Sequence, residues 1–306
     1  MLFGAAASGS AVVLPQRAFS ADGATQRYAT DYISFVGSDG VSTVYLAHDN
    51  NRGQTGDRFF ADHWICMWAE GEGWVPIKGS AHYENKERVL DRIPPSEHFR
   101  FRGSVADGLS FESQTNEMQF AMPGVMPVLS RRQSNGLFWV GSGPATLTWR
   151  GKRYAGRVIL EHLSRNDWNR FTNSFEAIWK NFNALYLKTS DGGDFYIHSQ
   201  DKAAPLTGKL VGFAAWGTPA PLTDVTFQIT ESVEADGGQF RWPTAWQIAF
   251  RHGGVNYEAD VKTRIKRDWA WWKTGGFMMS VVDGTIAPSD GSTSPKPVTG
   301  WGELLI

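Results

Sequence analysis

The residues best suited to chemistry lie mid-chain, where Glu161 and His162 are followed by Asp167 and Trp168. A carboxylic acid that aromatic side chains shield from water keeps its proton to a higher pH and can donate it to a substrate. A histidine can position or deprotonate a water molecule, and the face of a tryptophan can stabilise developing positive charge. These residue types indicate acid/base chemistry in an aromatic-lined pocket.

The spacing restricts how this first site can work. Successive side chains of a strand point to opposite faces, so Glu161 and His162 enter one pocket only if the strand bends or bulges at its end. The alternative is that the two residues form a polar closure between two halves of the molecule.

A second acidic residue and histidine, Asp62 and His63, stand immediately before Trp64 and close to Trp68. Beside tryptophan, such a pair could act as acid and base. An aspartate at the start of a strand also serves as a turn cap, and this alternative stays open.

Aromatic residues form a third candidate feature, because the chain holds 14 Trp, 19 Phe and 8 Tyr. Trp269 and Trp271 share one face of a strand and could form an aromatic wall. Core packing is the alternative, since aromatic side chains carry large buried area. The residues that we expect to line a ligand pocket are Trp64, Trp68, Trp168, Trp246, Trp269, Trp271 and Tyr186.

Signatures of other chemistries are missing from the sequence. Residues 141–143 read Gly-Ser-Gly and do not complete a nucleophile elbow. No histidine pair has metalloprotease spacing, no Cys/His cluster offers a zinc site, and no phosphate loop or dinucleotide fingerprint is present. The single cysteine, Cys66, excludes an intramolecular disulfide and is expected to be a buried apolar side chain. We therefore expect acid/base chemistry with no cofactor and no metal.

Composition narrows the range of partners. The formal net charge of the 306 residues is −1, and no basic face of the kind that binds nucleic acid is evident. No segment approaches the ~20 consecutive apolar residues of a transmembrane helix. A small-molecule partner is the expectation that remains, and the sequence does not determine an oligomeric state.

The elements that must position these residues are strands. Residues 225–230 alternate apolar and polar side chains, as a half-buried strand requires. Turn signals such as residues 135–136, 252–254 and 283–284 supply the positive φ of tight hairpins. Many short strands at even spacing predict an all-β fold of barrels or sandwiches. The expected strands are residues 41–48, 64–69, 97–103, 109–113, 117–122, 137–141, 145–150, 153–162, 176–189, 194–199, 209–217, 223–230, 245–251, 255–262 and 277–282.

Two strands resemble each other. Gly156 precedes Glu161 in one apolar run, and Gly300 precedes Glu303 in another at the end of the chain. Each run lies near the end of one expected domain. This echo predicts two similar β domains, residues 24–168 and 169–306, which pack closely because no low-complexity linker divides them.

The first 23 residues predict a leader. Residues 2–15 are small and apolar, and residues 18–21 read Ala-Phe-Ser-Ala, which resembles a signal-peptide cleavage site. The charged region that precedes such a segment is missing. We expect a periplasmic or secreted protein, and a disordered Ala/Gly-rich leader is the alternative.

Three segments resemble the lipocalin-like family that includes carotenoid 1,2-hydratase (hydroxyneurosporene synthase), fungal kievitone hydratase and the AttH-like secreted proteins. Residues 156–162 are similar to a family run of Gly, aromatic residue, acidic residue and His. Residues 241–248 are similar to the family's Tyr-Pro-x-x-Trp strand, and residues 299–304 to its C-terminal strand. In the hydratases the histidine is followed by Asn-Trp-Gly, whereas His162 leads into Leu163 and Ser164 here.

The resemblance implies two calycin-like β domains and a hydratase or pericyclase that acts on polyenes or other hydrophobic small molecules. It also implies that His162 lies in the pocket. Hydration of a C=C bond needs a strong proton donor and a place for the carbocation, and the aromatic and acidic residues above suit this.

Two other classes of function remain open. A lipocalin-like barrel commonly carries a hydrophobic ligand without converting it. Tryptophan platforms with carboxylates also suit carbohydrates, and two carboxylates roughly 5–10 Å apart in an open cleft would indicate that class.

Overall fold

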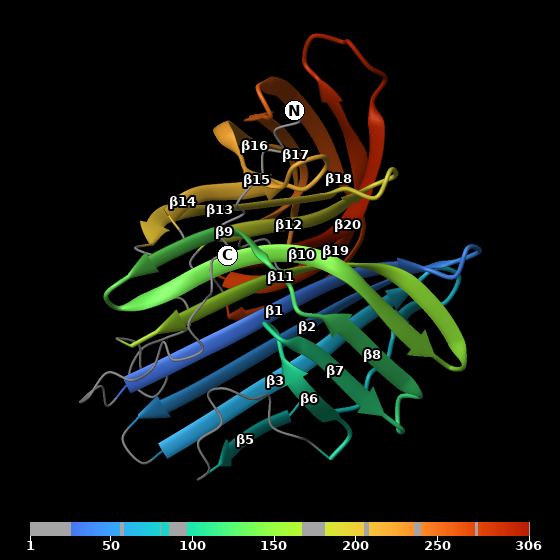
Figure 1. Ribbon diagram of the computed structural model, residues 1–306, viewed down its shortest axis with the longest axis vertical. Coiled ribbons are helices and arrows are strands. Elements are labelled where there is room, and N and C mark those ends of the chain that lie inside the picture. The colour runs from blue at the N-terminus through green and yellow to red at the C-terminus, as the bar shows by residue number, and fades with distance from the viewer. Residues whose placement is uncertain are drawn as a thin grey trace, which may run out of the picture.

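The computed structural model describes residues 26–55, 58–79, 81–85, 97–166, 181–204, 208–235, 240–272 and 275–305. Within these ranges the regular structure is β-strand throughout, without a helix. The all-β class expected from the sequence is confirmed. The strands form two antiparallel sheets, each curled into a half-barrel (Figure 1).

The first sheet holds eleven strands and the chemistry-bearing residues of the first half. Nine strands follow the order β4-β3-β2-β1-β11-β10-β8-β7-β6, while β5 pairs with β3 and β9 with β10. The strands are β1 (Gln26–Ser38), β2 (Thr43–Thr55), β3 (Arg58–Ala69), β4 (Gly73–Val75), β5 (Ala81–Asn85), β6 (Arg100–Ser104), β7 (Gly108–Ser113), β8 (Met118–Pro123), β9 (Pro127–Gln133), β10 (Gly136–Trp149) and β11 (Lys152–Arg165).

The second sheet holds nine strands in the order β15-β14-β13-β12-β20-β19-β18-β17-β16. In chain order, β12 is the first strand of this sheet and β20 is the last. These two strands pair with each other, as β1 and β11 do in the first sheet. The echo between the Glu161 and Glu303 runs therefore falls on corresponding strands. The strands are β12 (Phe182–Thr189), β13 (Asp194–Ala204), β14 (Gly208–Ala214), β15 (Ala220–Pro221), β16 (Thr223–Glu234), β17 (Arg241–His252), β18 (Val255–Trp272), β19 (Gly275–Pro288) and β20 (Lys296–Leu305).

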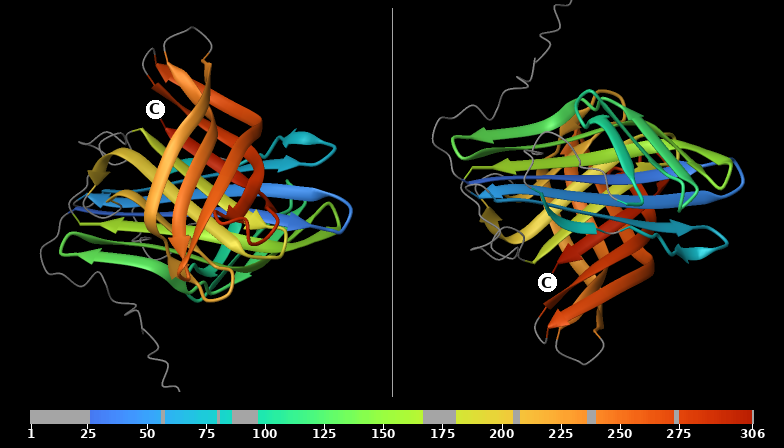
Figure 2. Two further views of the ribbon diagram at one scale, coloured as in Figure 1. Left: turned by 90° about the horizontal axis from the view of Figure 1, so that it is seen from above. Right: turned by 90° about the horizontal axis from the view of Figure 1, so that it is seen from below.

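The two sheets pack against each other, and the strands of one run steeply across those of the other in both views of Figure 2. Buried side chains from both sheets meet in this interface, among them Tyr32 and Phe138 from the first sheet and Tyr186 and Trp301 from the second. A separate apolar core fills the inner face of each half-barrel. Each sheet is thus covered on both faces in its central part.

Polar contacts add to the interface. Arg157 of β11 forms an ion pair with the buried Asp194 of β13, with 2.5 Å between Nη2 and Oδ2. The hydroxyl groups of Tyr45 and Thr299 lie 2.6 Å apart, and Tyr45 belongs to β2 while Thr299 belongs to β20. These contacts fix how the two sheets sit on each other.

Local sequence explains the tight turns. His252 pairs with Val255 at the end of the β17–β18 hairpin, so Gly253 and Gly254 alone form its loop. Both have positive φ, 57° and 84°, as a two-residue turn of this hairpin type requires.

Several strands depart from the expectation: β1, β5 and β9 match no expected strand, and β10 replaces two. Residues 137–141 and 145–150 are expected as two strands, but β10 runs without a break from Gly136 to Trp149. Its register shifts at Val140 and Gly141, and its outer partner changes from β9 to β8. Pairing with β11 continues through Pro144 on the other edge, which keeps the strand intact.

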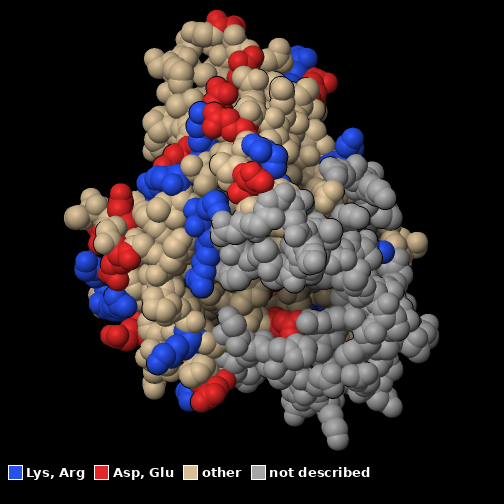
Figure 3. Space-filling view, turned by 180° about the vertical axis from the view of Figure 1, so that it is seen from behind, with Lys and Arg blue, Asp and Glu red and all other residues tan. Residues whose placement is uncertain are grey.

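The surface carries charges of both signs. Lysine, arginine, aspartate and glutamate are interspersed over the described part of the face in Figure 3. No described helix has the length and apolar character needed to span a membrane. The leader and the domain boundary after residue 168 lie outside the described residues, so the domain limits and export stay predictions.

Candidate functional site

Strand register gathers one polar row on the face of the first sheet that meets the second. Tyr32 of β1 stands directly opposite Glu161 of β11 on one side and Asp49 of β2 on the other. Asp49 in turn pairs with Trp64 of β3. Directly paired residues project from the same face, so all four side chains point toward the second sheet.

The second sheet contributes the opposing rows. Glu303 of β20 and His198 of β13 both pair with Ala184 of β12. Two residues farther along β12, Tyr186 pairs with Tyr196 of β13. We call the residues of both sheets the inter-sheet cluster, which comprises Tyr32, Asp49, Trp64, Glu161, Tyr186, Tyr196, His198 and Glu303.

Glu161 is the acceptor at the centre of this cluster. The hydroxyl of Tyr196 donates to Oε2 of Glu161 at 2.5 Å, and the hydroxyl of Tyr186 donates to the same oxygen at 3.4 Å. Nδ1 of His198 lies 3.9 Å from that oxygen. Burial raises the pKa of Tyr186 and of Tyr196 well above the usual value, so both phenols remain donors at neutral pH.

Asp49 lies at the outer edge of the cluster with three donors around its carboxyl group. Nδ2 of Asn51 donates at 2.7 Å, Nε1 of Trp64 at 3.1 Å and the hydroxyl of Thr30 at 3.2 Å. Burial among protein atoms nevertheless raises the pKa of Asp49 to about 6, against the effect of these hydrogen bonds. Asp49 therefore changes its charge close to neutral pH.

Glu303 is the candidate proton donor of the cluster. Burial raises the pKa of Glu303 well above its usual value, and the charges of Asp49 and Glu161 raise it further. The neighbouring phenols of Tyr32 and Tyr186 counteract this only in part. A carboxyl group whose pKa is raised in this way holds its proton to a higher pH, as a general acid must.

Aromatic rings enclose these carboxyl groups. The ring centroids of Tyr32 and Tyr186 lie 4.9 Å apart, and those of Tyr186 and Tyr196 lie 5.3 Å apart. Trp64 packs edge-on against Tyr32 and against Phe277 of β19. Trp64 and Phe277 are only half-buried, so they mark the solvent edge of the cluster. Such ring faces can stabilise a developing cation.

His162 lies on the opposite face of the first sheet from Glu161. Its Nδ1 contacts Oδ1 of Asp31 at 2.7 Å, and its ring stacks on Trp139. β11 runs straight through both residues, so alternation separates them, as the sequence expectation for an unbent strand requires. His162 does not reach the inter-sheet cluster, and its role in a pocket stays a prediction.

The other expected site residues are dispersed. Asp62 and His63 point to opposite faces of β3, with His63 buried inside the first half-barrel. Trp68 lies in the interface beneath Arg264, and Trp246 is buried inside the second half-barrel. Trp269 and Trp271 lie on β18, but their side chains, like Asp167 and Trp168, lie outside what the structure describes.

Of the expected set, Glu161, Trp64 and Tyr186 belong to the inter-sheet cluster. The sequence signal for Glu303 is that its run resembles the run that contains Glu161, although this resemblance assigns Glu303 no role. Tyr196 and His198 stand on alternate positions of a predicted strand, which is a signal that two polar side chains share one face. Asp49 and Tyr32 carry no comparable local signal.

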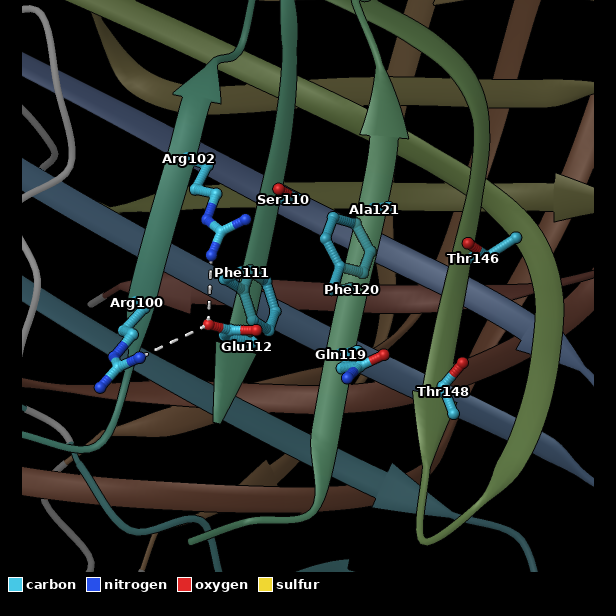
Figure 4. Close-up of a pocket in the computed structure, with 10 residues that line it drawn as sticks. All are labelled: Arg100, Arg102, Ser110, Phe111, Glu112, Gln119, Phe120, Ala121, Thr146 and Thr148. Carbon is cyan, nitrogen blue, oxygen red and sulfur yellow. Dashed lines mark ion pairs between the residues drawn. The ribbon is translucent and has the colours of Figure 1, made fainter. Parts of the chain in front are cut away.

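A hollow with a volume of about 270 Å³ lies elsewhere, on the outer face of the first sheet. Figure 4 shows Arg100 and Arg102 of β6 directed toward Glu112 of β7, at 4.0 and 3.6 Å. Both arginines are largely exposed, so water screens these charges. In the described part of the chain no group of three or more His, Cys, Asp or Glu has the arrangement of a metal site.

Comparison with solved structures finds this fold in a protein from Nitrosomonas europaea assigned as an AttH, with a TM-score of 0.55, 11% identity and 99% of both chains covered. Kievitone hydratase from Nectria haematococca aligns with a TM-score of 0.49 and 12% identity, over 92% of this chain and 88% of that chain. CghA, solved with Sch210972, aligns with a TM-score of 0.48 and 8% identity, over 92% and 88%. No protein-family model and no curated protein sequence matches the chain. The resemblance noted in the sequence is thus supported at the level of the fold.

Proposed function

We propose that this chain is a cofactor-independent hydratase, lyase or cyclase that acts on an unsaturated, hydrophobic small molecule in the inter-sheet cluster. The observation that carries the proposal is that Glu303, whose pKa burial raises well above its usual value, belongs to the same aromatic enclosure as the hydrogen-bonded acceptor Glu161. An acid and an acceptor held in one site from which water is largely excluded provide the two proton transfers that such reactions need.

The roles follow from the contacts. Glu303 donates a proton to one carbon of a C=C bond, and the ring faces of Tyr32 and Tyr186 stabilise the carbocation that forms on the other carbon. Water then forms a C–O bond to that carbon and gives its proton to Glu161, with His198 beside the same oxygen. Transfer of that proton from Glu161 back to Glu303 restores the site, so the sum is the addition of one water, and the reverse sequence eliminates it.

Cyclisation is a related reaction that the same site could catalyse, and the limited access of water to the two glutamates favours it over hydration. Glu161 and Glu303 are only 6% and 8% exposed, so few water molecules reach them. A second double bond of the same substrate would then attack the carbocation in place of water. The acid remains Glu303 and the final proton acceptor Glu161.

The carrier function expected as an alternative draws on the same enclosure. An aromatic site that is nearly closed to solvent binds an apolar ligand without needing to convert it. The two functions differ in the importance of Glu303, because a carrier needs no proton donor.

Turnover in water enriched in ¹⁸O tests the proposal. We would incubate the protein with the acyclic polyene lycopene and with farnesol, and follow products by mass spectrometry. Incorporation of one labelled oxygen reports hydration, and an isomer of unchanged mass reports cyclisation.

Glu303→Gln should lower turnover by about 100-fold or more, because an amide donates no proton to a carbon. Glu112→Gln, on the outer face of the first sheet, is the matched control and should leave turnover unchanged. Full turnover in a folded Glu303→Gln variant would exclude Glu303 as the acid. Tight binding without any product would favour the carrier.

A further inference from the structure

The inner face of the first half-barrel carries a second polar group of residues that the inter-sheet cluster does not use. Asp31 of β1 pairs with His162 of β11 and with Asn50 of β2, and Asn50 pairs with His63 of β3. His48 stands two residues before Asn50 on the same strand face, and Arg52 stands two residues after it. These side chains therefore form one continuous patch, which we call the inner polar patch: Asp31, His48, Asn50, Arg52, His63 and His162.

The patch is buried but incompletely hydrogen-bonded. His48, Asn50, His63 and Arg52 are 0%, 0%, 2% and 4% exposed. Neither ring nitrogen of His48 or of His63 has a hydrogen-bond partner within the described part of the chain, and the same holds for Nδ2 of Asn50 and Nε of Arg52. A buried polar group without a partner costs about 1–3 kcal/mol, so six such atoms in one place are unusual for a core.

The charged atoms of the patch already balance. Nη2 of Arg52 lies 2.5 Å from Oδ2 of Asp31, and Nη1 of Arg52 donates to Oδ1 of Asn50 at 2.7 Å. Asp31 also contacts His162. Because Asp31 neutralises Arg52, the unpartnered atoms are donors and acceptors in a site that holds no excess charge.

Aromatic rings cover the two histidines. Phe101 stacks on His48 with ring centroids 5.3 Å apart and packs edge-on against His63 at 5.2 Å. Phe111 contacts His48, and Phe99 contacts His63. A guest that reaches the unpartnered nitrogens therefore meets flat apolar surfaces.

The unpartnered atoms favour an acceptor-rich guest. Each neutral imidazole offers one donor and one acceptor, while Asn50 and Arg52 add only donors. Donors therefore outnumber acceptors by about four to two, and one carboxylate offers about four acceptor positions. We propose that the inner polar patch is a binding site for a small aromatic carboxylate, separate from the inter-sheet cluster.

Binding of a carboxylate is coupled to the uptake of one proton by a histidine of the patch. Burial lowers the pKa of His48 to about 3 and that of His63 to about 4, so both rings are neutral at neutral pH. The titratable and charged groups that act on His48 are His63, Asp31 and Arg52, and the charges of Asp31 and Arg52 are already paired with each other. A carboxylate placed against an imidazole compensates its positive charge, so one ring takes up a proton as the ligand enters.

Sodium benzoate is the probe, followed by the ¹⁵N resonances of histidine rings in the full chain. We expect benzoate to move the signals of His48 and His63 toward the protonated form and to leave His252 of β17 unchanged. The dissociation constant should rise about tenfold for each pH unit between pH 6 and pH 8, because one proton is bound with the ligand. Neutral benzamide should bind more weakly and without this pH dependence.

His48→Phe and His63→Phe, which extend the aromatic cover, should each weaken benzoate binding at least tenfold and raise the melting temperature. His252→Phe is the matched control and should leave binding unchanged. Glu303→Gln should also leave it unchanged, which separates this site from the proposed catalytic one. Unchanged His48 and His63 resonances at saturating benzoate, or binding without pH dependence, would overturn the proposal.

Discussion

Three carboxyl groups share the interface between the sheets, and their proximity determines their chemistry. Asp49, Glu161 and Glu303 lie in surroundings from which water is largely withdrawn, where like charges repel strongly. The pKa of Glu303 rises well above the usual range and that of Asp49 rises to about 6. An apolar residue at either position would pack without this cost, and strongly shifted pKa values of this kind are frequent at functional sites.

Stability should depend on pH through Glu303. Its pKa is higher in the folded than in the unfolded chain, where it is near 4.5, so the folded state binds more protons. The stabilisation is complete below pH 4.5 and is lost as the pH rises through the folded-state pKa. Glu303→Gln removes this loss because an amide stays neutral.

Thermal unfolding between pH 5 and pH 9 measures the effect. The melting temperature of Glu303→Gln should exceed that of the natural chain by an amount that grows with pH. Glu112→Gln, a control on the outer face of the first sheet, should follow the natural chain at every pH. Parallel curves for Glu303→Gln and the natural chain would show that Glu303 does not titrate abnormally.

At the scale of the element, the central strands approach closely at two glycines. A Cβ atom added to Gly300 of β20 would lie 2.0 Å from the carbonyl oxygen of Tyr186 in β12. A Cβ atom added to Gly156 of β11 would lie 2.1 Å from the carbonyl oxygen of Val36 in β1. In each sheet, therefore, a glycine allows the first and last strands in chain order to approach closely. Gly300 lies close to Glu303 in sequence, and Gly156 lies close to Glu161.

Gly300→Ala should destabilise the fold by about 1–3 kcal/mol, because backbone atoms must move to admit the methyl group. Gly143→Ala is the matched control, since its Cβ atom would meet only Val125 at an ordinary 3.6 Å. Chemical denaturation measures both. Equal midpoints for the two variants would mean that β20 and β12 have room to separate.

At the scale of the molecule, the active-site proposal depends on how the two half-barrels sit on each other. Glu161 belongs to the first sheet and the phenols that donate to it belong to the second. The ion pair between Arg157 and Asp194 joins the same two sheets. A change in sheet packing would therefore alter the hydrogen bonds of Glu161 without changing any residue of the cluster.

Arg157→Met should destabilise the protein by about 2–4 kcal/mol, because the buried carboxylate of Asp194 loses its counter-charge. Arg150→Met breaks an ion pair with Glu72 in which both side chains are about half exposed, and should cost less than about 1 kcal/mol. Denaturation midpoints compare the two. A similar small cost for both variants would show that the inter-sheet pair contributes little.

The sequence by itself determined the all-β class, the two-glycine turn between β17 and β18 and the separation of Glu161 from His162, whereas residues 283–284, expected as a turn, lie inside β19. These depend on the alternation of side chains along a strand and on the backbone freedom of residues such as Gly253 and Gly254, both of which are local properties. The likeness of the Glu161 and Glu303 runs was also readable, since corresponding strands keep similar patterns.

Only the tertiary structure decided which strand face meets the second sheet and which side chains come together there. Asp49, Glu161 and Glu303 come from three strands that are distant in sequence, and the raised pKa values of Asp49 and Glu303 arise from burial and from the proximity of the other carboxyl groups. The contact of His162 with Asp31 inside the first half-barrel is likewise set by the pairing of β1 with β11. Such outcomes depend on long-range strand register and sheet packing, which no local pattern specifies.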